Sequence, residues 1–221
     1  MLKLTAPLMN ELLRQPESGM GYQLVDAVMV AGETKRAVAY NAELLLFEDE
    51  SRDVLVKKTY QELVGVAESS SNKVKSLRLR RRPSTVTAGL VKEGEAIAAP
   101  KSPAADAPVG RTLAEEIFKR FSAYANDRRV QADHSLSAGT YATMEADAKH
   151  VKTGKQAVAR YALPNPQPAS YVFTIRPLQD TAIQRGILQP AYGQPGGGVE
   201  VIFPSGTQSN TVTGPIKIPD Q

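Results

Sequence analysis

The chain has 221 residues, of which 42% are hydrophobic, enough for one large domain or two small ones with cores of their own. It has no cysteine, which excludes disulfides and thiolate metal sites and fits a reducing compartment, and its two histidines are too few for a histidine-rich metal centre. The first residues form no sustained apolar run, so we expect neither a signal peptide nor a membrane span. We therefore expect a cytoplasmic protein, or one exported by a secretion system that reads no signal peptide.

The first part of the chain predicts a small antiparallel sheet preceded by one helix. Leucines at helical spacing predict a helix over residues 4–15, which Pro16 ends. Residues 58–66 fit either a short helix or a strand. We expect this part to form a β-rich N-terminal module over residues 1–83. Its predicted strands, joined by short polar or glycine turns, cover residues 22–30, 34–40, 43–47 and 54–56.

Positive charge is concentrated in one stretch that follows this sheet. The net charge is +4, yet residues 73–82 alone hold six Lys or Arg and no acid, so the rest of the chain is slightly acidic. The run could bind nucleic acid or an acidic partner, or it could be a solvated edge strand that its charges protect from aggregation. No aromatic residue interrupts it to stack on bases, which favours the edge strand and argues against a nucleic-acid partner.

The composition changes after residue 83. Residues 84–109 are rich in Ala, Pro, Ser and Gly, and their prolines forbid a helix and favour extended, mobile chain. We therefore predict a linker over 84–109 and a second domain over 110–221. In that domain, a capping box followed by apolar residues at helical spacing predicts a helix over 112–124. Thr143 is expected to cap a short helix. Further predicted elements are a Gly-Thr-Tyr strand near residue 141, a helix over 156–161, strands over 171–175 and 199–203, and a hairpin over 206–219.

The most distinctive stretch of the second domain is a glycine turn before its strand at 199–203. Three consecutive glycines, 196–198, allow positive φ and let the main chain approach a ligand closely. In the strand that follows, the alternation of side chains turns Glu200 away from its apolar neighbours. Such a turn could place one carboxylate beside a phosphate-bearing or nucleotide ligand. The alternative is a plain hairpin with an exposed Glu200.

The run from Tyr192 to Glu200, Tyr-Gly-Gln-Pro-Gly-Gly-Gly-Val-Glu, resembles the C-terminal motif of necrotizing-toxin-type NAD glycohydrolases, together with its lead-in from Gly186 and the strand over 171–175. In that family a Gly-Gln-Pro-Gly-Gly-Gly-x-Gln run closes a small β-rich domain related in shape to ADP-ribosyltransferases. The resemblance covers about the last half of the chain. It implies an ADP-ribosyltransferase-like α+β fold there. Glu200 stands where the family has Gln, and Glu is what the wider ADP-ribosyltransferase class has at its catalytic position.

The resemblance also implies a site that cleaves the nicotinamide–ribose bond of NAD without a metal. That reaction needs groups that hold the diphosphate and a negative or hydrogen-bonding group near C1′, where positive charge develops. We predict Glu200 as the catalytic residue. The predicted NAD contacts are Arg128, Arg129 and Arg160 for the diphosphate, His134, Thr140 and Tyr141 for polar or stacking contacts, and Tyr192, Gln194, Gly196, Gly197 and Gly198 in the glycine turn. Each also has a plainer interpretation, as surface charge, packing or loop.

Two functions follow from these observations. The first is an NAD-consuming toxin or effector enzyme, either an NAD glycohydrolase or, because a carboxylate can act as a base where an amide cannot, an ADP-ribosyltransferase. An immunity or delivery protein is then the expected partner. The second is a non-enzymatic structural or binding protein, such as a phage or secretion-system component. Convergence of Arg160, or of the Arg128–Arg129 pair, on Glu200 would separate the two.

Overall fold

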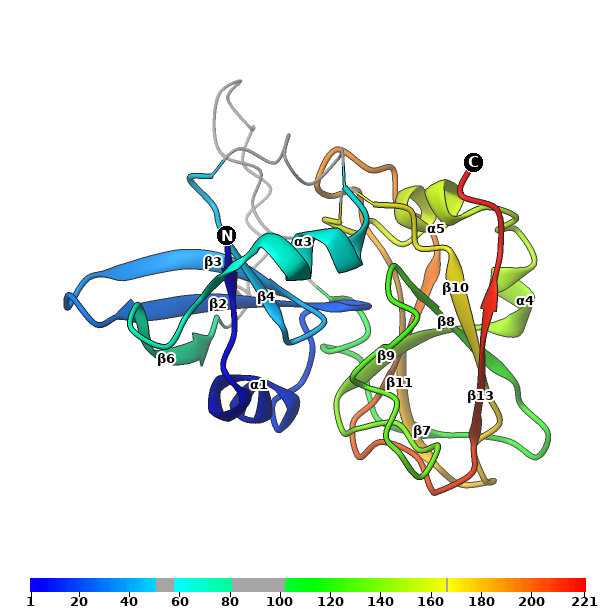
Figure 1. Ribbon diagram of the computed structural model, residues 1–221. Helices are drawn as coiled ribbons and strands as arrows, with labels where there is room; N and C mark the ends of the chain where they lie inside the picture. The colour runs from blue at the N-terminus through cyan, green and yellow to red at the C-terminus, as the bar shows by residue number, and fades with distance from the viewer. Residues whose placement is uncertain (51–57, 81–101, 166) are drawn as a thin grey trace, which may run out of the picture.

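The computed structural model describes residues 1–50, 58–80, 102–165 and 167–221. These residues form a β-rich α+β fold with a six-stranded and a seven-stranded sheet. Each sheet with its helices forms one lobe, and the two lobes lie side by side (Figure 1). The first lobe comprises residues 1–50 and 58–80, and the second comprises the rest. The prediction of an α+β, β-rich chain is confirmed at this level.

The first sheet has helices on opposite faces. Helix α1 (Ala6–Leu13) packs through Leu8 and Leu12 on one face, and α3 (Tyr60–Val66) packs through Tyr60 and Leu63 on the other (Figure 1). Alternation along each strand supplies an apolar side chain to both faces, which is why the strands read as almost continuously apolar. The strands, in the order β5-β1-β4-β3-β2-β6, are β5 (Glu68–Ser69), β1 (Leu2–Lys3), β4 (Leu44–Phe47), β3 (Thr34–Tyr40), β2 (Tyr22–Met29) and β6 (Val74–Leu79).

Most predictions for the first lobe are confirmed. The helix and the strands β2, β3 and β4 lie where the pattern places them. The ambiguous residues 58–66 contain helix α3, which begins at a capping box between Thr59 and Glu62. The strand expected over 54–56 lies outside the described residues. Strand β6 is an edge strand, as predicted, with Lys75 and Arg78 exposed and Val74 and Leu77 buried.

The second sheet carries two short helices on the face that holds the glycine turn. Helices α4 (Glu145–Ala148) and α5 (Gly154–Arg160) pack there against Tyr141 and Ile202, and a second cluster around Phe118 and Phe203 fills the opposite face. The strands, in the order β13-β10-β8-β9-β12-β11-β7, are β13 (Val212–Lys217), β10 (Tyr171–Ile175), β8 (Phe118–Ser122), β9 (Thr140–Met144), β12 (Val199–Phe203), β11 (Ala182–Ile187) and β7 (Gly110–Arg111).

Three predictions for the second lobe are wrong. The helix expected over 112–124 is absent: its central residues Phe118–Ser122 form strand β8, which pairs along its whole length with β10. Helical spacing misled here, since long-range pairing overrides local propensity. Thr143 does not cap a helix but lies in β9, and α4 begins without a side-chain cap. The hairpin expected over 206–219 is the single strand β13, which pairs with β10.

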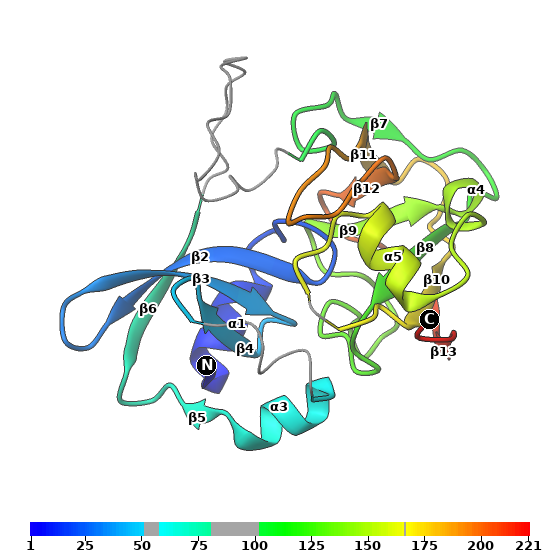
Figure 2. The ribbon, with the colours of Figure 1, turned by 90° about the horizontal axis from the view of Figure 1, so that it is seen from above.

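The second sheet opens into a fork between β8 and β9, which pair at only two positions. The chain between α1 and β2 enters this fork from the first lobe (Figure 2). The Glu17 carboxylate accepts hydrogen bonds from the backbone N–H of Tyr141 and from the Arg120 guanidinium, both at 2.9 Å. The Met20 sulfur accepts one from the N–H of Phe121 at 3.1 Å. The first lobe thus satisfies backbone donors that the fork leaves unpaired.

Candidate functional site

Glu200 is buried in the interior strand β12, with only 3% of its surface exposed. Alternation puts it on the same face as Ile202, and its register partner on β11 is Gly186. The hydroxyl of Ser102 donates a hydrogen bond to the Glu200 carboxylate. The interpretation of Glu200 as an exposed residue on a plain hairpin is therefore wrong. A buried carboxylate needs such partners, because burial without them is costly.

Tyr141 is connected to Glu200 by a hydrogen bond to the same serine, Ser102. It occupies the neighbouring strand β9, opposite Ile202, and its hydroxyl donates to Ser102 Oγ at 3.1 Å. Ser102 therefore links the predicted catalytic residue and one predicted NAD contact. No motif or periodic pattern singles out Ser102, which falls in the predicted linker.

A cleft of about 640 Å³ runs between the two lobes next to this cluster. Tyr141 and Ile202 line it from the second sheet, and Arg14 and Arg80 line it from the first lobe. Glu200 does not line the cleft, although its neighbours Ile202 and Tyr141 do. The cleft volume falls in the range of small-molecule sites, so the cleft is a candidate entrance to the Glu200 cluster.

The glycine turn fastens β12 to α5. The N–H of Gly196 donates to Ala159 O at 3.0 Å, that of Gly197 to Leu188 O at 2.9 Å, and that of Gly198 to Arg160 O at 3.1 Å. All three amides thus bind main-chain carbonyls of the protein, so in this arrangement they do not form a cradle for a phosphate. The geometry supports an architectural role for these glycines instead of the predicted ligand contact.

Replacing Gly198 by alanine should destabilise the second lobe. A Cβ at this position would lie 2.7 Å from the ring of Tyr161 and 2.9 Å from Arg160 O, too close for either neighbour to remain in place. We expect a loss of about 1–3 kcal/mol in the free energy of unfolding, typical of overpacking. Urea unfolding measures it, with Gly110→Ala as control, because the nearest atom to that Cβ is 3.9 Å away. Equal stability of the two variants would contradict the expectation.

Arg160 pairs with Asp147 instead of Glu200. Its Nε and Nη2 donate to the Asp147 carboxylate at 3.0 and 2.5 Å, and the Tyr161 hydroxyl donates to the same carboxylate at 3.1 Å. Burial alone would raise the pKa of Asp147, but the hydrogen bonds from Arg160 and Tyr161 outweigh it and lower that pKa. Arg160 therefore anchors α5 to α4.

The Asp147–Arg160 pair should make stability depend on acid pH. Because the pKa of Asp147 is lower in the folded than in the unfolded chain, its stabilisation is fully present above the unfolded value of about 3.9 and is lost as the pH falls through the folded value. We expect Asp147→Asn to be less stable than the wild type at neutral pH, with a difference that shrinks toward pH 3. Urea unfolding at both pH values measures it, and a constant difference would contradict this assignment.

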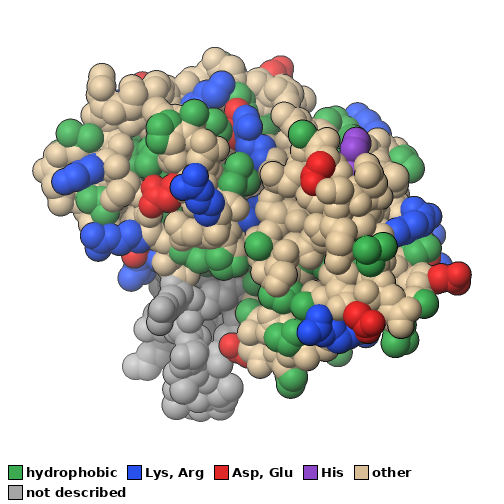
Figure 3. Space-filling view, turned by 90° about the horizontal axis from the view of Figure 1, so that it is seen from below, with side chains coloured by type: hydrophobic (Ala, Val, Ile, Leu, Met, Phe, Trp, Pro, Cys, Tyr) green, Lys and Arg blue, Asp and Glu red, His purple; other side chains and the backbone are tan. Residues whose placement is uncertain are grey.

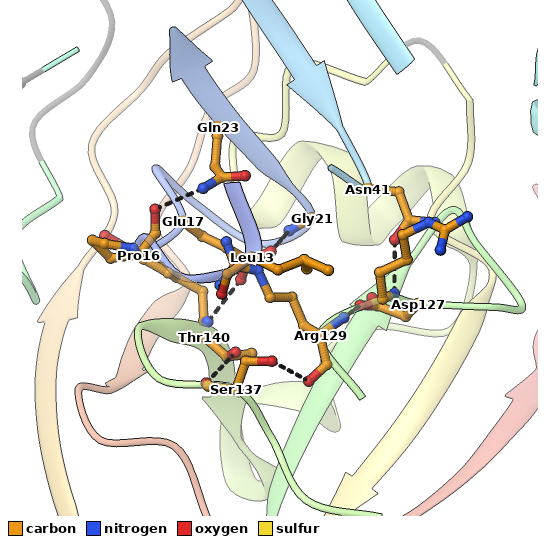
Figure 4. Close-up of polar contacts among 12 residues, drawn as sticks. Leu13, Pro16, Glu17, Gly21, Gln23, Asn41, Asp127, Arg129, Ser137 and Thr140 are labelled. Atoms are coloured by element: carbon orange, nitrogen blue, oxygen red, sulfur yellow. Dashed lines mark hydrogen bonds and ion pairs between the residues drawn. The ribbon is translucent and has the colours of Figure 1, made fainter. Parts of the chain in front are cut away.

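The other two predicted arginines lie at the junction of the lobes, where Figure 4 shows Arg129. Arg128 pairs with Glu43 at 2.9 Å. Arg129 is buried, donates to Gln15 O at 2.8 Å and lies 3.7 Å from Glu17. Burial lowers the pKa of the Arg129 guanidinium. Neither this pair nor Arg160 converges on Glu200, the arrangement that would have favoured the enzyme over the scaffold, and Arg128 and Arg129 instead join the lobes.

The remaining predicted contacts do not gather at Glu200. His134 is exposed in a loop with a φ of 59°. The Thr140 hydroxyl donates to Ser137 O at 2.6 Å (Figure 4). The Tyr192 ring meets that of Tyr22 edge-on at 5.9 Å, and Gln194 forms a main-chain bridge with the residue at 191. Of the predicted NAD contacts, Tyr141 is the one that the structure brings next to the Glu200 cluster.

A buried ion network that the sequence did not predict joins the lobes. Arg120 is fully buried and binds Glu17 and Asp127 through hydrogen bonds of 2.9–3.1 Å. Burial would lower the pKa of Arg120, but the two carboxylates outweigh it and raise that pKa, so the guanidinium stays charged. The sequence did contain one indication of this network. Arg120 lies between the apolar residues Phe118 and Phe121, and an arginine buried with them needs acids to pair with it.

The basic edge strand carries paired charges where the structure describes it. Lys73 pairs with Glu68, and Arg80 pairs with Glu48. On the face shown in Figure 3, basic side chains are interspersed with acidic ones instead of forming one basic surface. Both observations support the interpretation of residues 73–80 as a solvated edge strand, and residues 81 and 82 lie outside the described part.

The fold and the site define a β-rich α+β protein with two lobes, a buried carboxylate and an interlobe cleft. Among the described residues, no cluster of three or more His, Asp or Glu could hold a metal ion. No helix in the described ranges is long and apolar enough to cross a membrane. Comparison with protein-family models, curated proteins and solved structures gives no significant match. The resemblance to NAD glycohydrolases therefore stays a prediction.

Proposed function

We propose that the chain cleaves the nicotinamide–ribose bond of NAD as a glycohydrolase, with Glu200 as the catalytic residue. The observation that carries this proposal is the burial of Glu200 on an interior strand, held by Ser102 beside Tyr141 and next to the interlobe cleft. Carboxylates buried beside a cleft are frequent in active sites, because away from solvent their interaction with charge on a bound ligand is not screened by water. The motif from Tyr192 to Glu200 supports the same reaction.

The proposed reaction uses the charge of Glu200. The bond between ribose C1′ and the pyridinium nitrogen breaks, its electron pair moves to that nitrogen, and neutral nicotinamide leaves without an acid. The ribose ring becomes an oxocarbenium ion that the Glu200 carboxylate stabilises by charge and by hydrogen bonds to the ribose hydroxyls. Water then attacks C1′ and releases a proton. Tyr141 would pack against the ribose or the nicotinamide ring.

A scaffold or binding protein is the second candidate. Arg128, Arg129 and Arg160 pair with acids of the protein other than Glu200, and the amides of the glycine turn bind main-chain carbonyls. The buried network around Arg120 also locks the two lobes together. These contacts favour a rigid two-lobed unit whose polar groups serve its own architecture. An acceptor for ADP-ribose or an immunity protein is expected only if the chain is an NAD-cleaving enzyme.

The release of nicotinamide from NAD by the purified protein tests the proposal. We expect wild-type protein to accumulate nicotinamide over a long incubation, while Glu116→Gln, which alters a partly exposed ion pair with Arg185, behaves like the wild type. A folded wild-type protein that leaves NAD intact, and that captures a stable partner in a pull-down, would favour the scaffold.

A further inference from the structure

Residues 102–107, which we call the strap, lie over Glu200. Ser102 is 2% exposed and binds the carboxylate, and Ala104 is completely buried in the cluster that also holds Tyr141 and Ile202. The strap is folded into turns, in which Ala105 N–H donates to Ser102 O at 3.0 Å. The sequence placed these residues in an extended linker, yet here they form part of the second lobe.

Among the described residues, the strap is held by side-chain hydrogen bonds, including that of the Tyr141 hydroxyl to Ser102, and by packing, without strand pairing. The side-chain amide of Gln184 on β11 donates to Ala105 O at 3.2 Å and to Ala107 O at 2.7 Å. The hydroxyl of Ser102 supplies the bond to Glu200. The strap is a segment of turns and belongs to neither sheet, so these side-chain bonds and its packing on β11 keep it in place. Such segments open at lower free energy than the sheet beneath them.

The strap rests on the sheet at Gly186, the register partner of Glu200. A Cβ at Gly186 would lie 2.4 Å from Ala104 N and 2.5 Å from the carbonyl carbon of Pro103. The φ of Gly186 lies outside the left-handed region, so its strand conformation accepts an alanine. The absence of a side chain at this position is therefore needed for the strap to pack, and not for the strand itself.

The strap also reaches from Glu200 to the lining of the interlobe cleft. Its residues Ala105 and Asp106 line the cleft, while Ser102 at its other end contacts Glu200. Tyr141 reaches both, since it lines the cleft and donates to Ser102. Moving the strap away would therefore join the carboxylate to the cleft without moving either sheet.

We propose that the strap is a cover that keeps the Glu200 carboxylate closed off, and that its displacement opens one continuous site between the carboxylate and the interlobe cleft. The protein described here is then the closed form. The accessibility of Glu200 is a property of the chain alone, whereas the effect of opening on NAD cleavage rests on the proposed function.

Carboxyl labelling of Glu200 tests the cover. Full-length wild type, Gly186→Ala and Gly110→Ala are treated with a carbodiimide and a small amine, and labelled peptides are quantified by mass spectrometry. We expect labelling of Glu200 to rise severalfold in Gly186→Ala and to stay at the wild-type level in Gly110→Ala, whose Cβ meets ordinary contacts. Glu17, equally buried in the fork, should stay unlabelled in all three and so show that the fold is intact.

A second variant covers the case in which Gly186→Ala does not fold. Gln184→Ala removes both amide bonds to the strap while leaving the sheet pairing of β11, and it should also raise Glu200 labelling. Unchanged labelling of Glu200 in the folded variants would overturn the cover. Raised labelling supports it whether or not NAD is cleaved. Raised labelling with NAD left intact would reject the proposed function alone.

Discussion

Replacement of Arg120 by methionine should lower the free energy of unfolding by about 3–5 kcal/mol, as expected when one member of a buried ion network is removed. The change leaves the carboxylates of Glu17 and Asp127, both buried, without the guanidinium that bridges them. Arg129, 3.7 Å from Glu17, compensates in part. Because Glu17 comes from the first lobe and Arg120 from the second, the loss should also loosen the junction between the lobes.

Urea unfolding followed by circular dichroism measures this effect, with Arg185→Met as the matched control. Arg185 forms a partly exposed ion pair with Glu116, and such pairs contribute only about 0–1 kcal/mol. A double-mutant cycle with Glu17→Gln should show strong non-additivity, because the two residues share one network. If Arg120→Met costs no more than Arg185→Met, the network does not hold the lobes together.

Replacement of Glu200 by alanine should reduce the rate of nicotinamide release about 10²–10³-fold, the loss typical of removing one group that stabilises charge in a transition state. Alanine removes both the negative charge and the hydrogen-bond acceptor. The rate constant kcat should fall more than KM rises, because the oxocarbenium charge exists only in the transition state. A steady-state assay at a temperature where both proteins are folded measures it.

Glutamine at position 200 separates hydrolysis from transfer. It is the residue that the resembling family has at this position, and it keeps an acceptor for the Ser102 hydroxyl. We expect Glu200→Gln to retain part of the hydrolysis, because the amide keeps the hydrogen bonds to ribose but loses the charge, and to lose any transfer of ADP-ribose to an acceptor, because an amide cannot act as a base. If Glu200→Ala and wild type release nicotinamide equally fast, Glu200 is not the catalytic residue.

Local patterns predicted the first lobe better than the second. Strands β2, β3 and β4 follow runs of apolar residues with short turns between them, and α1 lies within the predicted residues 4–15 but ends at Leu13, before Pro16. Strand β8 was predicted as a helix because its apolar residues fall at helical spacing. Its pairing with β10, more than 40 residues later, is invisible to local pattern.

The candidate site was also predicted only in part, because local pattern reveals a strand but not its distant partners. Glu200 and its strand followed from alternation and the glycine motif, and its burial beside Tyr141 is consistent with a site. Its immediate partner Ser102 is 98 residues away in the sequence. Likewise, Glu17 reaches Arg120 across 103 residues. Side chains that meet over such separations leave no periodic signal, so their pairing could not be predicted from the sequence.

The most direct measurement is nicotinamide release from NAD by wild type, by Gly186→Ala and by the double variant Gly186→Ala/Glu200→Ala. We expect slow release by the wild type, faster release once the strap is displaced, and near-complete loss when Glu200 is also removed. If the folded Gly186→Ala protein, with Glu200 shown to be accessible by labelling, leaves NAD intact, the chain is not an NAD glycohydrolase that uses Glu200.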